Sequence, residues 1–226
     1  MRTILNEDDD LESLMPLFSK GRVKSSTQTV TNHLIFLDDD ITEPSNYRDV
    51  TECLLSCSPN DNVDILINSH GGHIDTALQI IQAMNACAAA HVGVTVIGAA
   101  YSAASMIACA AREVMIADNA EFMLHTAQYG SVGTVPNVRS QTDFVTRQIT
   151  RLLDQSYSGF LTEKEMAELK SGREFWFDAE EARKRMANRH RKLEADYKAA
   201  AQAQVEAAMP KKVAPTKKTP IKRTRK

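Results

Sequence analysis

Patterns of strand and helix alternate between residues 63 and 117, and this alternation constrains the fold more than any other feature of the chain. Buried strands are expected at VDILINS (63–69), VGVTVIG (92–98) and EVMIA (113–117), with helices between them at 73–90 and 102–111. This order predicts βαβ units with parallel strands and right-handed connections. The ends of successive strands should therefore meet at one edge of the sheet, where ligands usually bind.

Further elements flank this core. A short strand is expected at HLIFL (33–37), an extended segment at EFMLHT (121–126), and helices at 45–58, 135–161 and 179–209. TEKEMAELKSG begins with a capping box, in which Thr162 and Glu165 satisfy each other's backbone N–H groups.

The length of 226 residues suits one folded domain with appendages. We expect a polar, partly flexible N-terminal segment at 1–30, a folded domain at 31–182, a charged helical extension at 183–208 and a disordered basic tail at 209–226. The tail holds eight Lys and Arg and no acid. Because the whole chain has a net charge of −2, the residues before the tail carry a net charge of −10. Such a tail either keeps the protein in solution or docks on its acidic body, or it binds nucleic acid or an acidic partner.

The cysteines and the apolar runs indicate the setting of the protein. Cys53, Cys57, Cys87 and Cys109 fit no metal spacing, and Cys53 and Cys57 are expected to pack together on one helix. A reduced cytoplasmic location is therefore expected, with no metal and no organic cofactor. The acidic N-terminus is not a secretory signal, and no apolar run approaches the roughly 18 residues of a membrane span.

Two glycine-containing turns follow buried strands. In the first, Gly71 and Gly72 either form a plain turn or direct backbone N–H groups toward an oxyanion. In the second, Ser102 stands at a helix start directly after a strand. Its hydroxyl is either a simple N-cap or a nucleophile presented as in a nucleophile elbow, although the G-x-S-x-G pattern is absent. Ser105, one turn further on, is expected to serve helix packing.

A nucleophilic serine needs a base, and His125 at the end of EFMLH is the best candidate. The strand at 113–117 should return the chain to the edge that carries Ser102. The alternative is a histidine satisfied within the core. His70 and His73 flank the glycine pair and could contact a substrate.

These pieces together resemble the Clp protease proteolytic subunit, especially the Clp-like proteases of phage genomes. The family has a strand before N-S-P-G-G, where this chain has ILINSHGG. Its nucleophile motif corresponds to GAAYSAAS and selects Ser102, and its catalytic histidine corresponds to NAEFMLH and selects His125. An acid, an aromatic-rich strand and an A-E-E-A helix start follow a long helix, as in SGREFWFDAEEA here. The resemblance runs from about residue 33 to residue 182.

The chain departs from the family pattern at three points. His70 replaces the usual proline, and the segment after AEEA lacks the family's Y-G-L-x-D ending. The third member of the triad is the least defined. Glu174 is the nearest acid and is taken as the orienting carboxylate, whereas Asp178 is expected to cap the following helix. Otherwise a Ser–His dyad, or a carboxylate elsewhere, must serve.

The resemblance implies an α/β, ClpP/crotonase-like spiral of ββα units with a long protruding helix that stacks rings. It implies a serine endopeptidase that hydrolyses unfolded polypeptides inside a homo-oligomeric chamber, fed by an AAA+ ATPase unfoldase. The expected catalytic residues are Ser102, His125 and Glu174, and the expected oxyanion hole is formed by Gly71, Gly72 and Ala103. Two alternatives stay open: a non-catalytic scaffold, and an acyl-CoA enzyme of the crotonase type.

Overall fold

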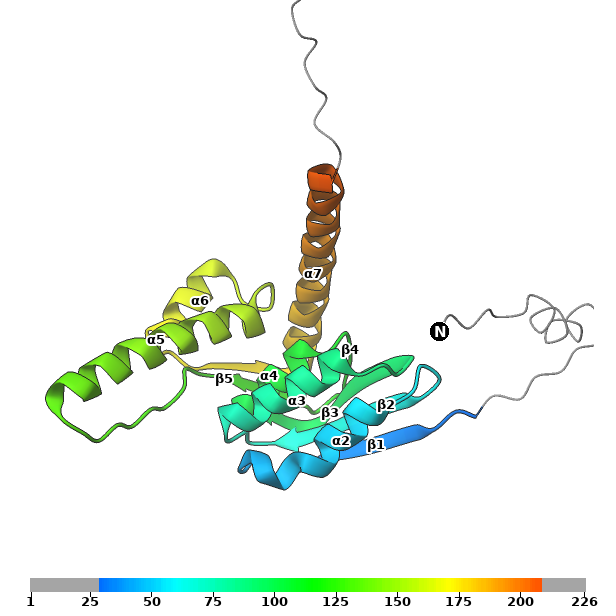
Figure 1. The fold of residues 1–226 in the computed structure, drawn as a ribbon, viewed down its shortest axis with the longest axis horizontal. Helices are drawn as coiled ribbons and strands as arrows, with labels where there is room; N and C mark the ends of the chain where they lie inside the picture. Colours follow the sequence, from blue (N-terminus) through cyan, green and yellow to red (C-terminus); the bar gives the residue numbers. More distant parts are fainter. Residues whose placement is uncertain (1–28, 209–226) are drawn as a thin grey trace, which may run out of the picture.

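The computed structural model describes residues 29–208 (Figure 1), so the expected tail at 209–226 and nearly all of the N-terminal segment lie outside the described residues. The elements in chain order are β1 (Asn32–Leu37), the 3-10 helix η2 (Pro44–Tyr47), α2 (Arg48–Ser56), β2 (Asn62–Ser69), α3 (Ile74–Ala86), β3 (His91–Tyr101), α4 (Ala103–Ala110), β4 (Glu113–Ile116), β5 (Glu121–Leu124), α5 (Val135–Tyr157), α6 (Glu163–Lys170), β6 (Phe175–Asp178) and α7 (Ala179–Ala208).

One six-stranded sheet organises these elements. Its strand order is β1-β2-β3-β5-β6, and β4 also pairs with β3. The first half of the long strand β3 pairs in parallel with β4, and its last residues, Ala99–Tyr101, pair in parallel with β5. Only β6 runs antiparallel, alongside β5. The mixed α/β class expected from the sequence is confirmed, including the long α5 and the long C-terminal helix.

Several elements end at residues other than the expected ones, for local reasons. β3 continues to Tyr101 because Ala99–Tyr101 find a partner in β5. α3 stops at Ala86 because Cys87 adopts an extended conformation. α5 stops at Tyr157, and Gly159 then turns the chain with a φ of +82°.

Helices α2, α3 and α4 cover one face of the sheet (Figure 1). Beneath them the alternating residues of the strands are fully buried, as at Val63, Ile65 and Ile67 of β2. Residues on the opposite face stay open: Leu34 and Phe36 are each 55% exposed and Met115 is 70% exposed. The sheet therefore has one packed face and one apolar face that no layer formed by residues 29–208 covers.

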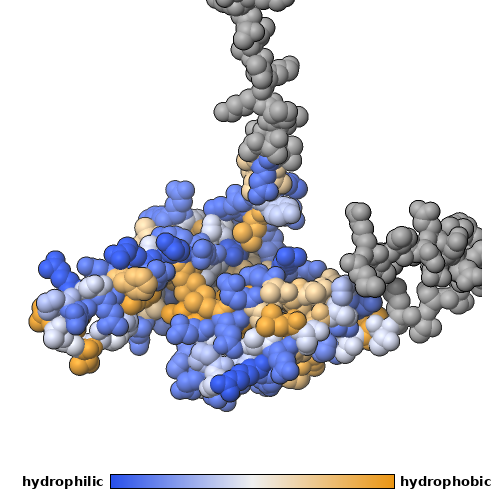
Figure 2. All heavy atoms as spheres, in the orientation of Figure 1, coloured by the Kyte–Doolittle hydropathy of each residue, from blue (hydrophilic) through white to orange (hydrophobic). Residues whose placement is uncertain are grey.

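Helices α5 and α6 project together from the sheet (Figure 1). The base of α5 is anchored by Tyr157, which is buried against the core together with Phe160. Hydrophobic residues gather where this base meets α3, and again at the far end of α5 (Figure 2). Within residues 29–208, no helix combines the length and the apolar character needed to cross a bilayer.

The long helix α7 is fixed to the domain by Arg189. This residue is only 4% exposed, and its guanidinium donates to the carbonyl oxygens of Cys109 at 2.8 Å and Ser158 at 2.6 Å. These carbonyls lie at the C-terminal ends of α4 and α5, where the helix dipole favours a positive charge. Burial lowers the pKa of Arg189. α7 continues without a break across position 182, so the segment division at 182/183 stays a prediction.

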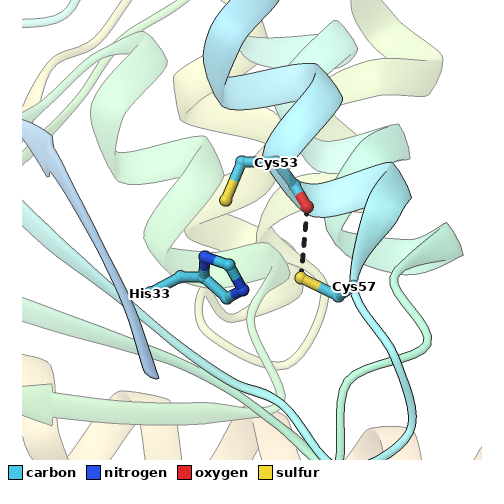
Figure 3. Close-up of side chains that lie close together, drawn as sticks. All are labelled: His33, Cys53 and Cys57. Atoms are coloured by element: carbon cyan, nitrogen blue, oxygen red, sulfur yellow. Dashed lines mark hydrogen bonds between the residues drawn. The ribbon is translucent and has the colours of Figure 1, made fainter. Parts of the chain in front are cut away.

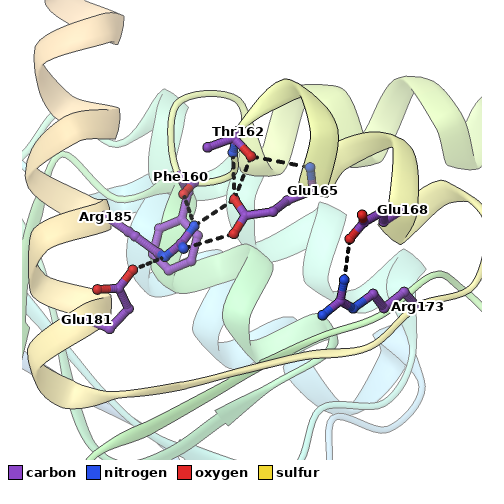
Figure 4. Close-up of polar contacts among 7 residues, drawn as sticks. All are labelled: Phe160, Thr162, Glu165, Glu168, Arg173, Glu181 and Arg185. Atoms are coloured by element: carbon purple, nitrogen blue, oxygen red, sulfur yellow. Dashed lines mark hydrogen bonds and ion pairs between the residues drawn. The ribbon is translucent and has the colours of Figure 1, made fainter.

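A second arginine of α7, Arg185, joins three elements (Figure 4). Both oxygens of Glu165 accept from it at 2.9 Å, Glu181 accepts at 2.7 Å, and its guanidinium lies 4.3 Å from the centre of the Phe177 ring. Glu165 also completes the predicted capping box with Thr162 at the start of α6, which is confirmed. The bidentate bond to Arg185, and then the bonds to Thr162, lower the pKa of Glu165 to about 2.

We predict that Glu165→Gln lowers the free energy of unfolding by roughly 1–3 kcal/mol at pH 7, because it removes one charge of a partly buried, bidentate pair. Because the pKa of Glu165 is depressed in the folded state, the stabilisation is complete above the ordinary carboxyl pKa of 4.5. It is lost as the pH falls toward about 2. Urea unfolding from pH 7 down to pH 2.5 should show the difference between wild type and variant shrinking below pH 4.5.

Glu163→Gln is the matched control, because Glu163 lies in the same first turn of α6 and is exposed. Both variants lose the same favourable charge near a helix N-terminus. An equal destabilisation in the two variants would contradict the role given to the Arg185 pair.

Candidate active site

The pairing of β3 with β5 brings Ser102 and His125 together. Tyr101 at the end of β3 is level with Met123 of β5, and the Ser102 N–H donates to the Met123 carbonyl at 2.8 Å. Ser102 comes directly after Tyr101, and His125 comes two residues after Met123. The parallel register thus places the two side chains beside each other at the same edge of the sheet.

Ser102 has an unusual backbone conformation. It is the only non-glycine residue with positive φ within the part of the chain that the structure describes, at φ 53° and ψ −119°. Such a conformation costs about 1–3 kcal/mol and persists only where the surroundings enforce it. The Ser102 side chain makes no capping bond to α4, so the simple N-cap expected as the alternative is not what its hydroxyl does.

The Ser102 hydroxyl instead contacts the histidine. Its Oγ lies 2.7 Å from His125 Nε2, a normal hydrogen-bond distance. With the ring proton on Nδ1, Nε2 accepts the hydroxyl proton, which is the arrangement that a general base requires.

The Ser102 carbonyl is held by a small buried network. It accepts from the Ser105 hydroxyl at 2.7 Å, and that hydroxyl lies 2.8 Å from the Tyr157 hydroxyl at the base of α5. Ser105 is fully buried, as expected for a packing serine, and Tyr157 is 1% exposed. Burial raises the pKa of Tyr157 far above its usual range, so the phenol stays neutral. This network links α5 to the turn that carries Ser102.

The glycine pair lies directly against this turn. Gly71 has a φ of +92°, and a side chain there would lie 2.5 Å from the Tyr101 carbonyl oxygen and 3.0 Å from the Ala103 nitrogen. The Gly71 N–H donates to Ser69 Oγ at 3.0 Å. Among residues 29–208, by contrast, the N–H groups of Gly72 and Ala103 have no acceptor. The site therefore offers two free backbone donors beside Ser102.

Glu174 and His125 lie just past the end of the β5–β6 pairing. β5 and β6 are antiparallel, and their last observed pair is Leu124 opposite Phe175, which His125 follows and Glu174 precedes along the chain. Glu174 is exposed, and no carboxylate of residues 29–208 forms an ion pair with His125. Asp178 accepts from the Glu181 N–H at 2.8 Å, which confirms its expected role as a helix cap.

Aromatic rings border the site on the open face of the sheet. His70 stacks on Tyr101 at a centroid distance of 5.3 Å, and Tyr101 meets Trp176 edge-on at 5.1 Å. The Tyr101 hydroxyl is bound to Glu121. His70 thus packs against Tyr101, the residue before Ser102, whereas His73 lies at the start of α3 and borders a cavity.

That cavity has a volume of about 550 Å³. It lies between α3, α5 and the chain just after His125, and Leu78, Phe144 and Leu152 give it an apolar lining. His73 and Ala127, which also line it, follow the glycine pair and His125 along the chain. An apolar space of this size, lined by residues that follow the glycine pair and His125, is suited to a substrate side chain.

The Ser102 site brings together one imidazole and one hydroxyl, with the exposed Glu174 just past the end of the β5–β6 pairing. Within the described residues, the grouping of three metal-ligand side chains lies elsewhere, at His33, Cys53 and Cys57.

A family model described as Clp protease matches residues 19–185. The chain belongs to the Clp protease family. This match extends beyond the segment of motif resemblance at both ends and covers most of the chain. No curated protein matches the chain. Membership of the Clp protease family indicates a serine-type peptidase, while the phage-type assignment stays a prediction.

Sequence motifs alone selected Ser102 and His125, but they missed the groups that hold them. The Met123 carbonyl and the Tyr157 hydroxyl anchor the Ser102 turn, and neither carries a signal in the sequence. A backbone carbonyl is present at every residue, and Tyr157 lies 55 residues from Ser102. Only the folded arrangement identifies them.

We predict that Gly71→Ala destabilises the fold by at least about 1–3 kcal/mol, because an L-residue is strained at this positive φ and its Cβ would meet the Tyr101 carbonyl. Urea unfolding measures the loss. Gly130→Ala is the control, since a Cβ there meets nothing within 4 Å, and its effect should stay below about 1 kcal/mol. Equal stability of the two variants would disprove the close approach at Gly71.

Proposed function

We propose that this chain is a serine endopeptidase of the Clp type, which hydrolyses peptide bonds of unfolded polypeptides. The observation that carries the proposal is the 2.7 Å contact between Ser102 Oγ and His125 Nε2, beside two backbone N–H groups that have no acceptor in the described part of the chain. Family membership supports the same chemistry.

In the proposed mechanism Ser102 Oγ attacks the carbonyl carbon of the scissile peptide while His125 Nε2 takes the hydroxyl proton. The tetrahedral intermediate collapses when the imidazolium gives that proton to the leaving amine, and an acyl-enzyme remains. A water molecule then attacks the ester, with His125 again as base. Its proton returns to Ser102 Oγ as the carboxylic acid product leaves.

The Gly72 and Ala103 N–H groups are proposed to bind the oxyanion, because both adjoin the Ser102 turn and neither has an acceptor among residues 29–208. The Gly71 N–H is already bound to Ser69, so its role is to allow the close turn. Fixed donors of this kind stabilise the charge that develops in the transition state, and the loss of one costs about 10²–10³ in rate.

Glu174 is proposed to orient the imidazole. Continuing the antiparallel β5–β6 register by one pair would set this carboxylate opposite His125, which supports the proposal. Catalytic hydrogen bonds are often long without substrate and tighten when substrate binds. The carboxylate would hold the Nδ1–H tautomer and stabilise the imidazolium.

We also propose that the chain assembles into rings that enclose the active sites, as Clp proteases typically do. The uncovered apolar face of the sheet, with Leu34, Phe36 and Met115 exposed, supports burial against further copies. The projecting α5 would stack the rings. Polypeptide would then enter through a narrow opening, delivered by an AAA+ unfoldase.

Ser102→Ala should abolish peptide hydrolysis and labelling by a fluorophosphonate, while circular dichroism and thermal unfolding stay near those of wild type. Peptide mapping should locate the label of wild type on Ser102. Ser56→Ala, a change at an exposed position on α2, should be labelled like wild type. Full hydrolysis by Ser102→Ala would refute the proposal. If the wild-type protein binds coenzyme A and is not labelled, the result would favour an acyl-CoA enzyme. If the wild-type protein is folded but neither binds coenzyme A nor is labelled, the result would favour a scaffold.

Glu174→Gln should lower kcat by about 10²–10⁴, because the neutral amide neither fixes the imidazole as strongly nor stabilises the imidazolium. KM should change little, since substrate binding does not use this side chain. Glu180→Gln is the matched control, an exposed acid six residues further along the chain. Steady-state kinetics on a fluorogenic peptide separates the two constants. Wild-type kcat in Glu174→Gln would mean that a dyad or another carboxylate serves.

A further inference from the structure

A second group of reactive side chains lies apart from the active site, where β1 meets α2. The imidazole of His33 on β1 faces the thiols of Cys53 and Cys57 from α2 and its C-cap (Figure 3). One ligand atom from each of the three residues lies within 4.8 Å of the other two. The sequence does not reveal this group, because His33 lies 20 residues before Cys53 and only the sheet brings them together.

The geometry of the group suits a tetrahedral zinc ion. With Zn–S near 2.3 Å and Zn–N near 2.0–2.1 Å, ligand atoms of a tetrahedral site lie about 3.5–3.8 Å apart. Shifts of about 1 Å or less would bring the three atoms to those separations. Cys53 and Cys57 form a C-x3-C pair, a spacing within the range found in zinc sites, so the initial interpretation that these cysteines fit no metal spacing is revised for this pair.

The charges around the group favour a cation. Cys57 caps the C-terminus of α2, and Cys87 caps the C-terminus of the neighbouring α3. Helix C-termini carry partial negative charge. The carboxylate of Asp61 adds negative charge near Cys57. It accepts hydrogen bonds from the Ser58 N–H at 2.7 Å and the Thr31 N–H at 3.1 Å, which hold it in place.

Cys87 supplies a fourth sulfur at this place. Its sulfur is not one of the three ligand atoms that lie within 4.8 Å of one another, so it would have to approach them when the metal binds. Cys87 is half-buried and comes from a third element, so a site that includes it would join β1, α2 and α3.

Packing alone accounts for the group less well. It would favour aliphatic side chains, yet here the ring nitrogens of His33 have no hydrogen-bond partner among residues 29–208.

We propose that His33, Cys53 and Cys57 bind a zinc ion, with Cys87 as the fourth ligand. Two kinds of soft or borderline donor, thiolate and imidazole, select zinc over the oxygen-preferring Mg²⁺ and Ca²⁺. The thiols release their protons to solvent as the metal binds.

The ion would stabilise the position of β1, the edge strand of the sheet. Among residues 29–208, β1 pairs only with β2, so its other side has no ladder within this part of the chain. A bond from His33 through zinc to α2 and α3 would tie this strand to the helical layer. The site is structural and separate from Ser102, so it does not depend on the proposed peptidase activity.

The test uses the full chain, stripped of metal with a chelator under reducing conditions. Titration with Co²⁺ should give one equivalent of binding, with the intense sulfur-to-cobalt and visible bands of a tetrahedral thiolate site. Zn²⁺ should displace the Co²⁺ and raise the melting temperature. His33→Ala, Cys53→Ser and Cys57→Ser should each weaken zinc binding by more than the roughly 10–100-fold loss typical of an outer-shell change.

Cys109→Ala is the matched control, because Cys109 is buried in α4 outside the group, and it should bind zinc like wild type. Circular dichroism of each variant verifies that it is folded. Wild-type protein without thiolate bands, or Cys57→Ser with unchanged zinc affinity, would overturn the proposal. Unchanged affinity in Cys87→Ser would overturn the assignment of the fourth ligand.

Discussion

The hydrogen bond from the Ser102 N–H to the Met123 carbonyl is the contact on which the site depends. It extends the β3–β5 ladder by one residue, past the point where β3 has ended. The chain must then turn sharply into α4, which forces Ser102 into its positive φ. The serine side chain is thereby directed away from the helix it precedes and toward His125.

The same constraint explains the small residues around Ser102. A side chain at Gly98 would lie 2.2 Å from Asn68 Oδ1, the atom that accepts the Ala99 N–H at 2.9 Å. Ala103 is fully buried, and a Cβ on Gly71 would lie only 3.0 Å from its nitrogen. Larger aliphatics would add hydrophobic burial, but they would separate the two turns that form the site.

Helix caps could be predicted from the sequence because their signals lie within a few neighbouring residues. The capping box at Thr162 and the Asp178 cap follow from spacing within one turn of helix, and both are present. Ser102 and His125 could be selected because parallel strands end at one edge. The residue opposite His125 could not be predicted in the same way, because it depends on the register of β6, which no short motif specifies.

Long-range contacts set the other limit of prediction. The division of β3 between β4 and β5 follows from the short turn at 117–120, where Ala120 N–H bonds the Ala117 carbonyl, and not from the sequence of β3 itself. His33 meets Cys53 and Cys57 for the same reason: their approach is a property of the sheet and the helix packed on it.

Helix α7 has a buried first part and an exposed second part. Its first three turns join the hydrophobic core through Ala182 and Met186. At the end of these turns, Arg189 donates hydrogen bonds to carbonyl oxygens at the C-terminal ends of both α4 and α5. From Arg191 to residue 204 the helix is exposed. A chain that stopped at residue 185, where the family match ends, would leave the carbonyl oxygens of Cys109 and Ser158 without their cation, so we expect it to be less stable than a chain that keeps Arg189.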